Sequence, residues 1–264
     1  GRTFSDIDIL VARPDASSIE FGLLINGWTR VFVDDYDQRY YREWMHEIPP
    51  LRHKDRQTVI DLHHNILPPT NKDSPRPDKF CHQTVHRPEV GDIQVLASED
   101  ALIHSATHLF SESEYHNGLR DLSDIDLLLK HFSAQNPEFT SQLITRALTL
   151  GLAKYLYLAL RYTRLVLHNQ SGITSQQEHQ INPNFSPLYL KLLDFCFLNI
   201  FLPDHSTSRS WRLPLAKFIL HIRGHLIRMP LKMLIPHLLH KAFITPFHEW
   251  KRQRQLATEQ KPIT

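Results

Sequence analysis

The chain opens on alternating aspartate and isoleucine that lead straight into apolar residues, in the run Asp6-Ile7-Asp8-Ile9-Leu10-Val11. This alternation predicts a β-strand over residues 5–11, because side chains two positions apart in a strand point to the same face. Asp6 and Asp8 would therefore project side by side. Magnesium binds carboxylate oxygens and commonly takes substrate phosphates as further ligands. The run predicts a strand that carries a metal site; the alternative is a pair of solvated turn residues before an edge strand.

Two more motifs accompany this strand. The run Val59-Ile60-Asp61-Leu62-His63-His64 predicts a second strand, and histidines at 104 and 108 precede the helical segment Arg120-Asp121-Leu122-Ser123-Asp124-Ile125. Together with Arg2-Thr3-Phe4-Ser5-Asp6-Ile7-Asp8, these motifs resemble the DNA polymerase β-type nucleotidyltransferase superfamily. Within it they resemble an uncharacterised bacterial nucleotidyltransferase family whose members often accompany polysaccharide or exosortase gene clusters. The resemblance extends over about residues 2–130.

The resemblance implies a reaction and a set of catalytic residues. The expected enzyme is Mg²⁺-dependent and moves a nucleoside monophosphate from an NTP to a hydroxyl acceptor, which is a sugar, a small molecule or a protein side chain. Asp6, Asp8 and Asp61 would be its catalytic and metal-binding residues. In the two-metal scheme, cations about 3.5–4 Å apart clamp the attacking and leaving oxygens. We therefore expect two Mg²⁺ ions, with Mn²⁺ as the alternative, and expect Asp61 to accept the proton of the hydroxyl.

The residues before the paired aspartates predict phosphate contacts, but one motif of the superfamily is missing from this chain. Arg2 and Ser5 match the family's positions, so they would bind the phosphates of the nucleotide; the alternative is a terminal residue and a cap at the start of the strand. The superfamily also carries a Gly-Ser or Lys-Gly-like phosphate-binding motif further upstream, which this chain, beginning at Gly1, lacks. We therefore expect an N-terminally truncated chain. The second hypothesis is a catalytically degenerate nucleotidyltransferase-like module that docks to a membrane surface or a protein partner.

The pattern along the chain predicts an α+β fold, with a small mixed-sheet nucleotidyltransferase core followed by an α-helical domain. The core would span residues 1–97, incomplete at its N-terminus, and the helical domain residues 98–204. Within the core, residues 21–33 read as a helix end, a turn and a strand, residues 39–48 as strand or loop, and residues 85–96 as a weak strand or extended segment. Apolar residues at helical spacing predict helices over 102–110, 119–132, 143–150, 155–167 and 188–201.

Residues 205–264 would form a basic amphipathic helix and a polar tail. From His205 onward the chain has eleven Lys and Arg against two acidic residues, a net charge of +9, whereas the whole chain carries only +2. The segment 209–243 interleaves these cations with apolar residues, and Pro230 and Pro236 must kink or divide it. Such a segment packs with a basic solvent face, lies on an anionic membrane, or binds nucleic acid or an acidic protein. No specific nucleic-acid motif accompanies it.

Composition narrows the location of the protein. No apolar run reaches the length of about 18 residues that a spanning helix needs. Cys81 and Cys196 lie far apart and fit no metal-ligand spacing, which favours a reducing compartment over a disulfide framework. We expect a cytoplasmic protein, with the inner face of the membrane as a peripheral site.

Three histidines and a repeated motif need separate interpretation. His104 and His108 share one helix face, a spacing that can bind zinc, although a structural role is favoured because no third ligand is evident. His63 would touch the substrate or fill the wall of the site. The second Ser-Asp-Ile-Asp run, Ser123–Asp126, lies in a helical pattern. Residues two apart on a helix diverge, so its aspartates cannot share one ion.

Overall fold

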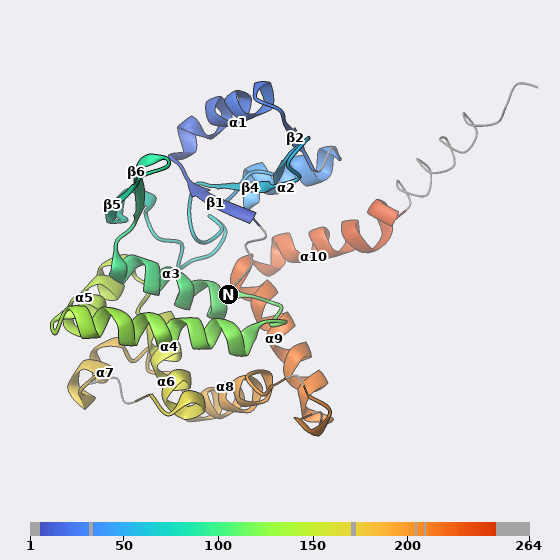
Figure 1. Ribbon diagram of the computed structural model, residues 1–264. Coiled ribbons are helices and arrows are strands. Elements are labelled where there is room, and N and C mark those ends of the chain that lie inside the picture. The colour runs from blue at the N-terminus through green and yellow to red at the C-terminus, as the bar shows by residue number, and fades with distance from the viewer. Residues whose placement is uncertain (1–5, 32–33, 170–172, 204, 209, 247–264) are drawn as a thin grey trace, which may run out of the picture.

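The computed structural model describes residues 6–31, 34–169, 173–203, 205–208 and 210–246. It confirms the α+β fold: a small mixed sheet lies above a set of helices, and α3 lies between the sheet and the helices α4 to α8 (Figure 1). The four-stranded sheet has the order β1-β4-β3-β2, with β1 (Asp6–Leu10), β4 (Val59–His63), β3 (Leu51–His53) and β2 (Trp28–Arg30). β1 and β4 are parallel, and β3 is antiparallel to both of its neighbours.

One face of this sheet is packed by α1 (Ala16–Ile25). Ile60 and Leu62 point to that face and are buried with Ala16, Trp28 and Leu51 in a small core. The helix ends at Ile25, and Gly27 adopts φ 90°, a left-handed conformation that glycine tolerates, before β2 begins. This confirms the helix, turn and strand predicted for residues 21–33. Because side chains alternate along a strand, Asp61 and the paired aspartates of β1 lie on the opposite face.

The prediction of a strand or loop over residues 39–48 is wrong, because most of these residues belong to a helix. This helix, α2 (Asp35–Trp44), begins at the side chain of Asp34, whose Oδ1 accepts hydrogen bonds from the backbone N–H groups of Tyr36 and Asp37. Arg42 donates from its two Nη atoms to the buried carboxylate of Glu20, at 3.0 and 2.8 Å. This ion pair holds α2 against α1, so the short segment after α2 meets the sheet in a fixed position.

A separate β-hairpin follows the sheet. It comprises β5 (His82–Arg87) and β6 (Gly91–Leu96), which pair along their full length. The sequence indicated a weak strand or an extended segment over residues 85–96, and the structure has two strands there, the end of β5 and all of β6. Gly91 turns the chain with φ 83°, where a side chain would be strained. The hairpin leads directly into the first helix of the helical domain.

The helical domain comprises α3 (Ser98–Ser111), α4 (Gly118–Gln135), α5 (Phe139–Leu150), α6 (Ala153–Leu167), α7 (Ser175–Ile181) and α8 (Pro187–Ile200). Phe110, Tyr162, Phe197 and Phe201 form a buried aromatic cluster at its centre, with ring centroids 5.0–6.2 Å apart. The five helices predicted from the apolar spacing are confirmed. The polar helix α7 lacks an apolar stripe, and its sequence therefore gave no helical signal. Short 3₁₀ turns occupy Arg13–Asp15, Pro77–Lys79 and Ser206–Ser208.

The basic C-terminal segment forms two helices, α9 (Arg212–Arg228) and α10 (Leu231–Leu239), with a π-helical turn at His240–Ile244. The chain breaks between them at Pro230, as expected, whereas Pro236 lies inside α10. α10 returns to the N-terminal part of the chain, where Lys241 Nζ lies 2.5 Å from Asp37 Oδ1 on α2. Within the described residues, no helix is long and apolar enough to cross a membrane.

Candidate functional site

Three carboxylates share the open face of the sheet. In the parallel pairing of β1 with β4, Asp8 is the register partner of Asp61, and Asp6 precedes Asp8 by two positions on the same strand. Register partners in parallel strands point to the same face, as do residues two apart. The structure therefore brings together Asp6, Asp8 and Asp61, the three residues that the sequence analysis grouped.

The environment of Asp61 suits a bound cation. Its Oδ1 is buried and has no hydrogen-bond partner, a state that costs free energy in a closed interior. Burial raises the pKa of this carboxyl, and the charges of Asp6 and Asp8 raise it further. A divalent cation would supply the missing contact and neutralise the like charges. The donor set of three carboxylates also matches the oxygen ligands that Mg²⁺ prefers, so these residues fit the expected metal.

His63 contacts both Asp8 and a fourth carboxylate, that of Glu47. Its Nε2 lies 3.2 Å from Asp8 Oδ1 and 3.5 Å from Glu47 Oε2. The hydrogen bond with His63 lowers the pKa of Asp8. Burial opposes the charge on His63, but Asp8 and Glu47 outweigh it and raise the pKa of the imidazole. The pair therefore favours an ionised Asp8, which is the form that binds metal.

Sequence reasoning missed Glu47 and His46, which follow α2. A bridge between Glu47 and His63 attaches this segment to the end of β4, and the N–H of His64 donates to the carbonyl of His46 at 2.7 Å. One ligand atom from each of His46, Glu47 and His63 lies within 4.8 Å of the others. Burial lowers the pKa of His46 to about 3 and raises that of Glu47 to about 7. No spacing in the sequence signals this cluster, because the pairing of distant segments creates it.

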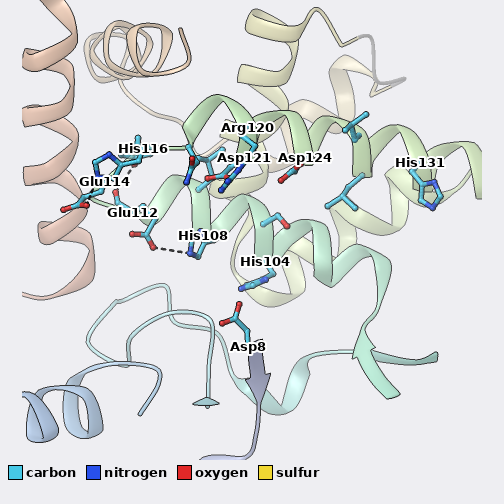
Figure 2. Close-up of a pocket in the computed structure, with 16 residues that line it drawn as sticks. Asp8, His104, His108, Glu112, Glu114, His116, Arg120, Asp121, Asp124 and His131 are labelled. Atoms are coloured by element: carbon cyan, nitrogen blue, oxygen red, sulfur yellow. Dashed lines mark hydrogen bonds and ion pairs between the residues drawn. The ribbon is translucent and has the colours of Figure 1, made fainter. Parts of the chain in front are cut away.

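The second wall of the site comes from α3. Figure 2 shows the side chain of Asp8, on β1, pointing toward His104 on this helix. Burial lowers the pKa of His104 to about 4, helped by the neighbouring His108. One turn further, His108 Nε2 lies 3.6 Å from Glu112 Oε1. Both histidines thus line the cleft, and their structural role stays a prediction.

The repeated Ser-Asp-Ile-Asp run is helical, as predicted, and lies in α4. Its two aspartates have different environments. Asp126 is buried and contacts Lys130 and Asn169, whereas Asp124 lines a cavity of about 920 Å³ between α3 and α4. Arg120 lines the same cavity, which reaches Asp8 and His104 (Figure 2). The two aspartates therefore share no ion, in agreement with the helical geometry.

The carboxylates open into a cleft of about 1510 Å³ bounded by the sheet, the hairpin, α3 and the end of α9. Its described lining contains five acidic side chains but a single Lys or Arg, which is Arg228. Arg228 Nη2 lies 3.2 Å from Glu112 Oε2, and Thr70 Oγ1 donates to the carbonyl of Arg228 at 2.7 Å. The excess of acidic groups attracts cations, and Arg228 places a guanidinium on the opposite wall. Arg2 and Ser5, the expected phosphate-binding residues, lie outside the described residues.

The comparisons with known proteins agree with this arrangement. The model of a family described as "Uncharacterised nucleotidyltransferase" matches residues 1–168. The chain belongs to this family. The match covers the sheet, the hairpin and the helices α3–α6, and so includes all three carboxylates and both α3 histidines. The nucleotidyltransferase family points to transfer of a nucleoside monophosphate group as the general class of activity. A search of curated proteins and a search of solved structures found no match.

Proposed function

We propose that this protein is a Mg²⁺-dependent nucleotidyltransferase that moves a nucleoside monophosphate from an NTP to a hydroxyl acceptor. The observation that carries the proposal is the orphaned Oδ1 of Asp61 beside its register partner Asp8. Asp6, Asp8 and Asp61 would hold the metal. Bound there, Mg²⁺ would neutralise phosphate charge and make the attacking hydroxyl more acidic.

The protein's own residues have distinct roles in this proposal. The acceptor oxygen forms a bond to the α-phosphorus, the bond from that phosphorus to the bridging oxygen breaks, and pyrophosphate leaves. The hydroxyl proton passes to Asp61, the register partner of Asp8 on the same face of the sheet. His63 orients Asp8 through the contact at 3.2 Å. Arg228 faces the anionic phosphates from the far wall of the cleft.

Calorimetric titration of the chain with an NTP, with and without Mg²⁺, tests the proposal. We expect binding that requires the metal and is lost in Asp61→Asn. Asp55→Asn is the matched control, because Asp55 is an exposed acid in the turn after β3 and should leave binding unchanged. Retained binding by Asp61→Asn would contradict the site. A lack of binding by the wild-type chain would favour the degenerate docking module.

A second experiment identifies which class of hydroxyl is the acceptor. An NTP labelled at the α-phosphorus is offered with sugars, small alcohols and serine- or tyrosine-containing peptides, and the labelled product identifies the class of hydroxyl. We expect loss of transfer of roughly 10²–10⁴-fold in Asp61→Asn, the range for removal of a general base. Transfer at the wild-type rate by this variant would exclude Asp61 as the proton acceptor.

A further inference from the structure

Helix α9 has two apolar faces on opposite sides. Ala216, Leu220 and Gly224 are buried, and α9 packs on α8. The other face carries five exposed apolar side chains, which we call the exposed stripe: Trp211, Leu215, Phe218, Ile222 and Leu226. Their spacing of three or four residues places them in one row, because each residue turns an α-helix by about 100°. Trp211 is 73% exposed and Phe218 61% exposed, so nothing in the described chain covers this row.

Exposed cationic side chains accompany the exposed stripe. On the same helical projection, Arg212 falls along one edge of the row, and the exposed Lys217 lies farther round the helix. Arg223 instead points inward, where its Nε donates to Tyr189 Oη and its Nη1 donates to the carbonyl of Phe110. The segment 210–246 contains six Lys and Arg and no Asp or Glu. Long basic side chains beside apolar ones can reach phosphate groups while their stems stay in contact with hydrocarbon. A protein partner would need a matching acidic and apolar surface, whereas an anionic bilayer presents both properties everywhere.

A cavity extends the exposed stripe inward. It has a volume of about 540 Å³, lies between α8 and α9, and is lined mainly by apolar side chains. Ile222 and Leu226 belong both to the exposed stripe and to this lining, and the charged residues Lys72 and Asp73 lie at the same cavity. The surface thus offers an apolar recess beside the exposed stripe, with a lysine in its lining. That combination matches a lipid, whose acyl chains and anionic headgroup are joined in one molecule.

We infer that the exposed stripe of α9 docks the protein on an anionic lipid bilayer. The helix lies along the surface with Trp211 and Phe218 in the interfacial region, where amphipathic aromatic rings are favoured. Arg212 contacts the headgroups beside the row, and the exposed Lys217 adds positive charge near the same surface. This docking does not depend on the proposed transfer reaction, since the exposed stripe shares no residue with the carboxylate site.

Flotation of the full chain with lipid vesicles tests this inference. Vesicles of phosphatidylcholine alone are compared with vesicles of phosphatidylcholine and phosphatidylglycerol in equal parts. We expect the protein to float only with the anionic vesicles and to be released by high salt, which screens the charges. Phe218→Ser should weaken vesicle binding at least about tenfold, the effect of losing one buried large apolar side chain. Lys217→Glu should weaken it about fivefold or more.

Matched controls separate docking from general effects of the substitutions. Phe21→Ser removes an aromatic side chain that is 65% exposed on α1, and Lys54→Glu reverses an exposed charge after β3. Both should bind vesicles like the wild type. Circular dichroism should show that Phe218→Ser remains folded, as expected for an exposed position. Flotation that is unchanged in both α9 variants would overturn the inference. So would self-association of the wild type that Phe218→Ser abolishes, without any flotation, because a second copy would then cover the exposed stripe.

Discussion

Asp8 and Asp61 are register partners on neighbouring parallel strands, so their carboxylates leave the sheet on the same face and at the same level. An adjacent pair of like charges in a partly closed cleft is unfavourable unless a cation accompanies it. Burial raises the pKa of Asp61, and the charges of Asp6 and Asp8 raise it further. Such an arrangement costs stability in the absence of a ligand and suits a bound cation.

Magnesium should stabilise the folded protein. A ligand that binds only the folded state adds about 2.7 kcal/mol to the free energy of unfolding at a concentration one hundred times its Kd. We expect a gain of this order from chemical denaturation with and without Mg²⁺, and no gain in Asp8→Asn. Asp55→Asn should respond like the wild type. An equal gain in Asp8→Asn would place the ion elsewhere.

His104 should make the metal-free protein sensitive to acid. Its pKa falls from 6.5 to about 4 in the folded state, so the unfolded chain binds a proton between these values and the folded chain does not. The free energy of unfolding therefore falls as the pH drops from 6.5 toward 4, by at most about 1.4 kcal/mol per pH unit for this group.

The comparison with His104→Gln isolates that contribution. Urea denaturation across this pH range should give a shallower loss of stability for the variant. Glu47 has the opposite effect on the free energy of unfolding. Its pKa is raised from 4.5 to about 7, so between these pH values the folded state binds a proton that the unfolded chain does not. Glu47→Gln should consequently steepen the loss. Parallel curves for the wild type and His104→Gln would show that the histidine is protonated in the folded protein.

Arg228 should discriminate nucleotides by the number of their phosphates. A hydrogen bond to a charged group contributes about 1.5–3 kcal/mol, so Arg228→Ala should weaken NTP binding by roughly tenfold or more. Affinity for the matching NMP should change little, because the site loses a contact to the outer phosphates. Calorimetry with both nucleotides measures the ratio. Lys232→Ala, an exposed cation just beyond the cleft, is the control; equal losses for NTP and NMP would indicate a structural role for Arg228.

Gly224 should be essential to the position of α9. A Cβ added there would lie 2.6 Å from the backbone Cα of Ser113 and 2.7 Å from the carbonyl oxygen of Glu112, so Gly224→Ala must push the helix away. We expect a loss of about 1–3 kcal/mol in the free energy of unfolding. Gly22→Ala is the matched control, because its Cβ meets nothing within 4 Å. That variant should be neutral or up to about 1 kcal/mol more stable, and a similar result for Gly224→Ala would contradict the close packing.

Local patterns predicted much of the fold and the central part of the site. The alternation of apolar and polar residues identified β1 and β4. The paired aspartates are neighbours of Asp61 because the two strands pair in parallel, in an unbroken register that sets Asp8 opposite Asp61. Glu47 could not be anticipated in this way, since residues 39–48 read as strand or loop and the structure places α2 there. Its approach to His63 depends on a bridge between distant segments. Arg228 was evident as a basic residue, but its place in the cleft depends on contacts with distant segments, through Thr70 and Glu112.

The cleft draws its walls from the beginning, the middle and the far end of the chain, with Asp8 on β1, His104 on α3 and Arg228 on α9. During synthesis on the ribosome, the acidic wall and its histidines can assemble while α9 is still unmade. The nascent protein would then already attract metal ions but would lack the arginine that faces them. Under the proposed function, competence to hold a complete nucleotide would therefore arrive late, with the emergence and docking of α9. The helix beyond the family match would then act as a final assembly step.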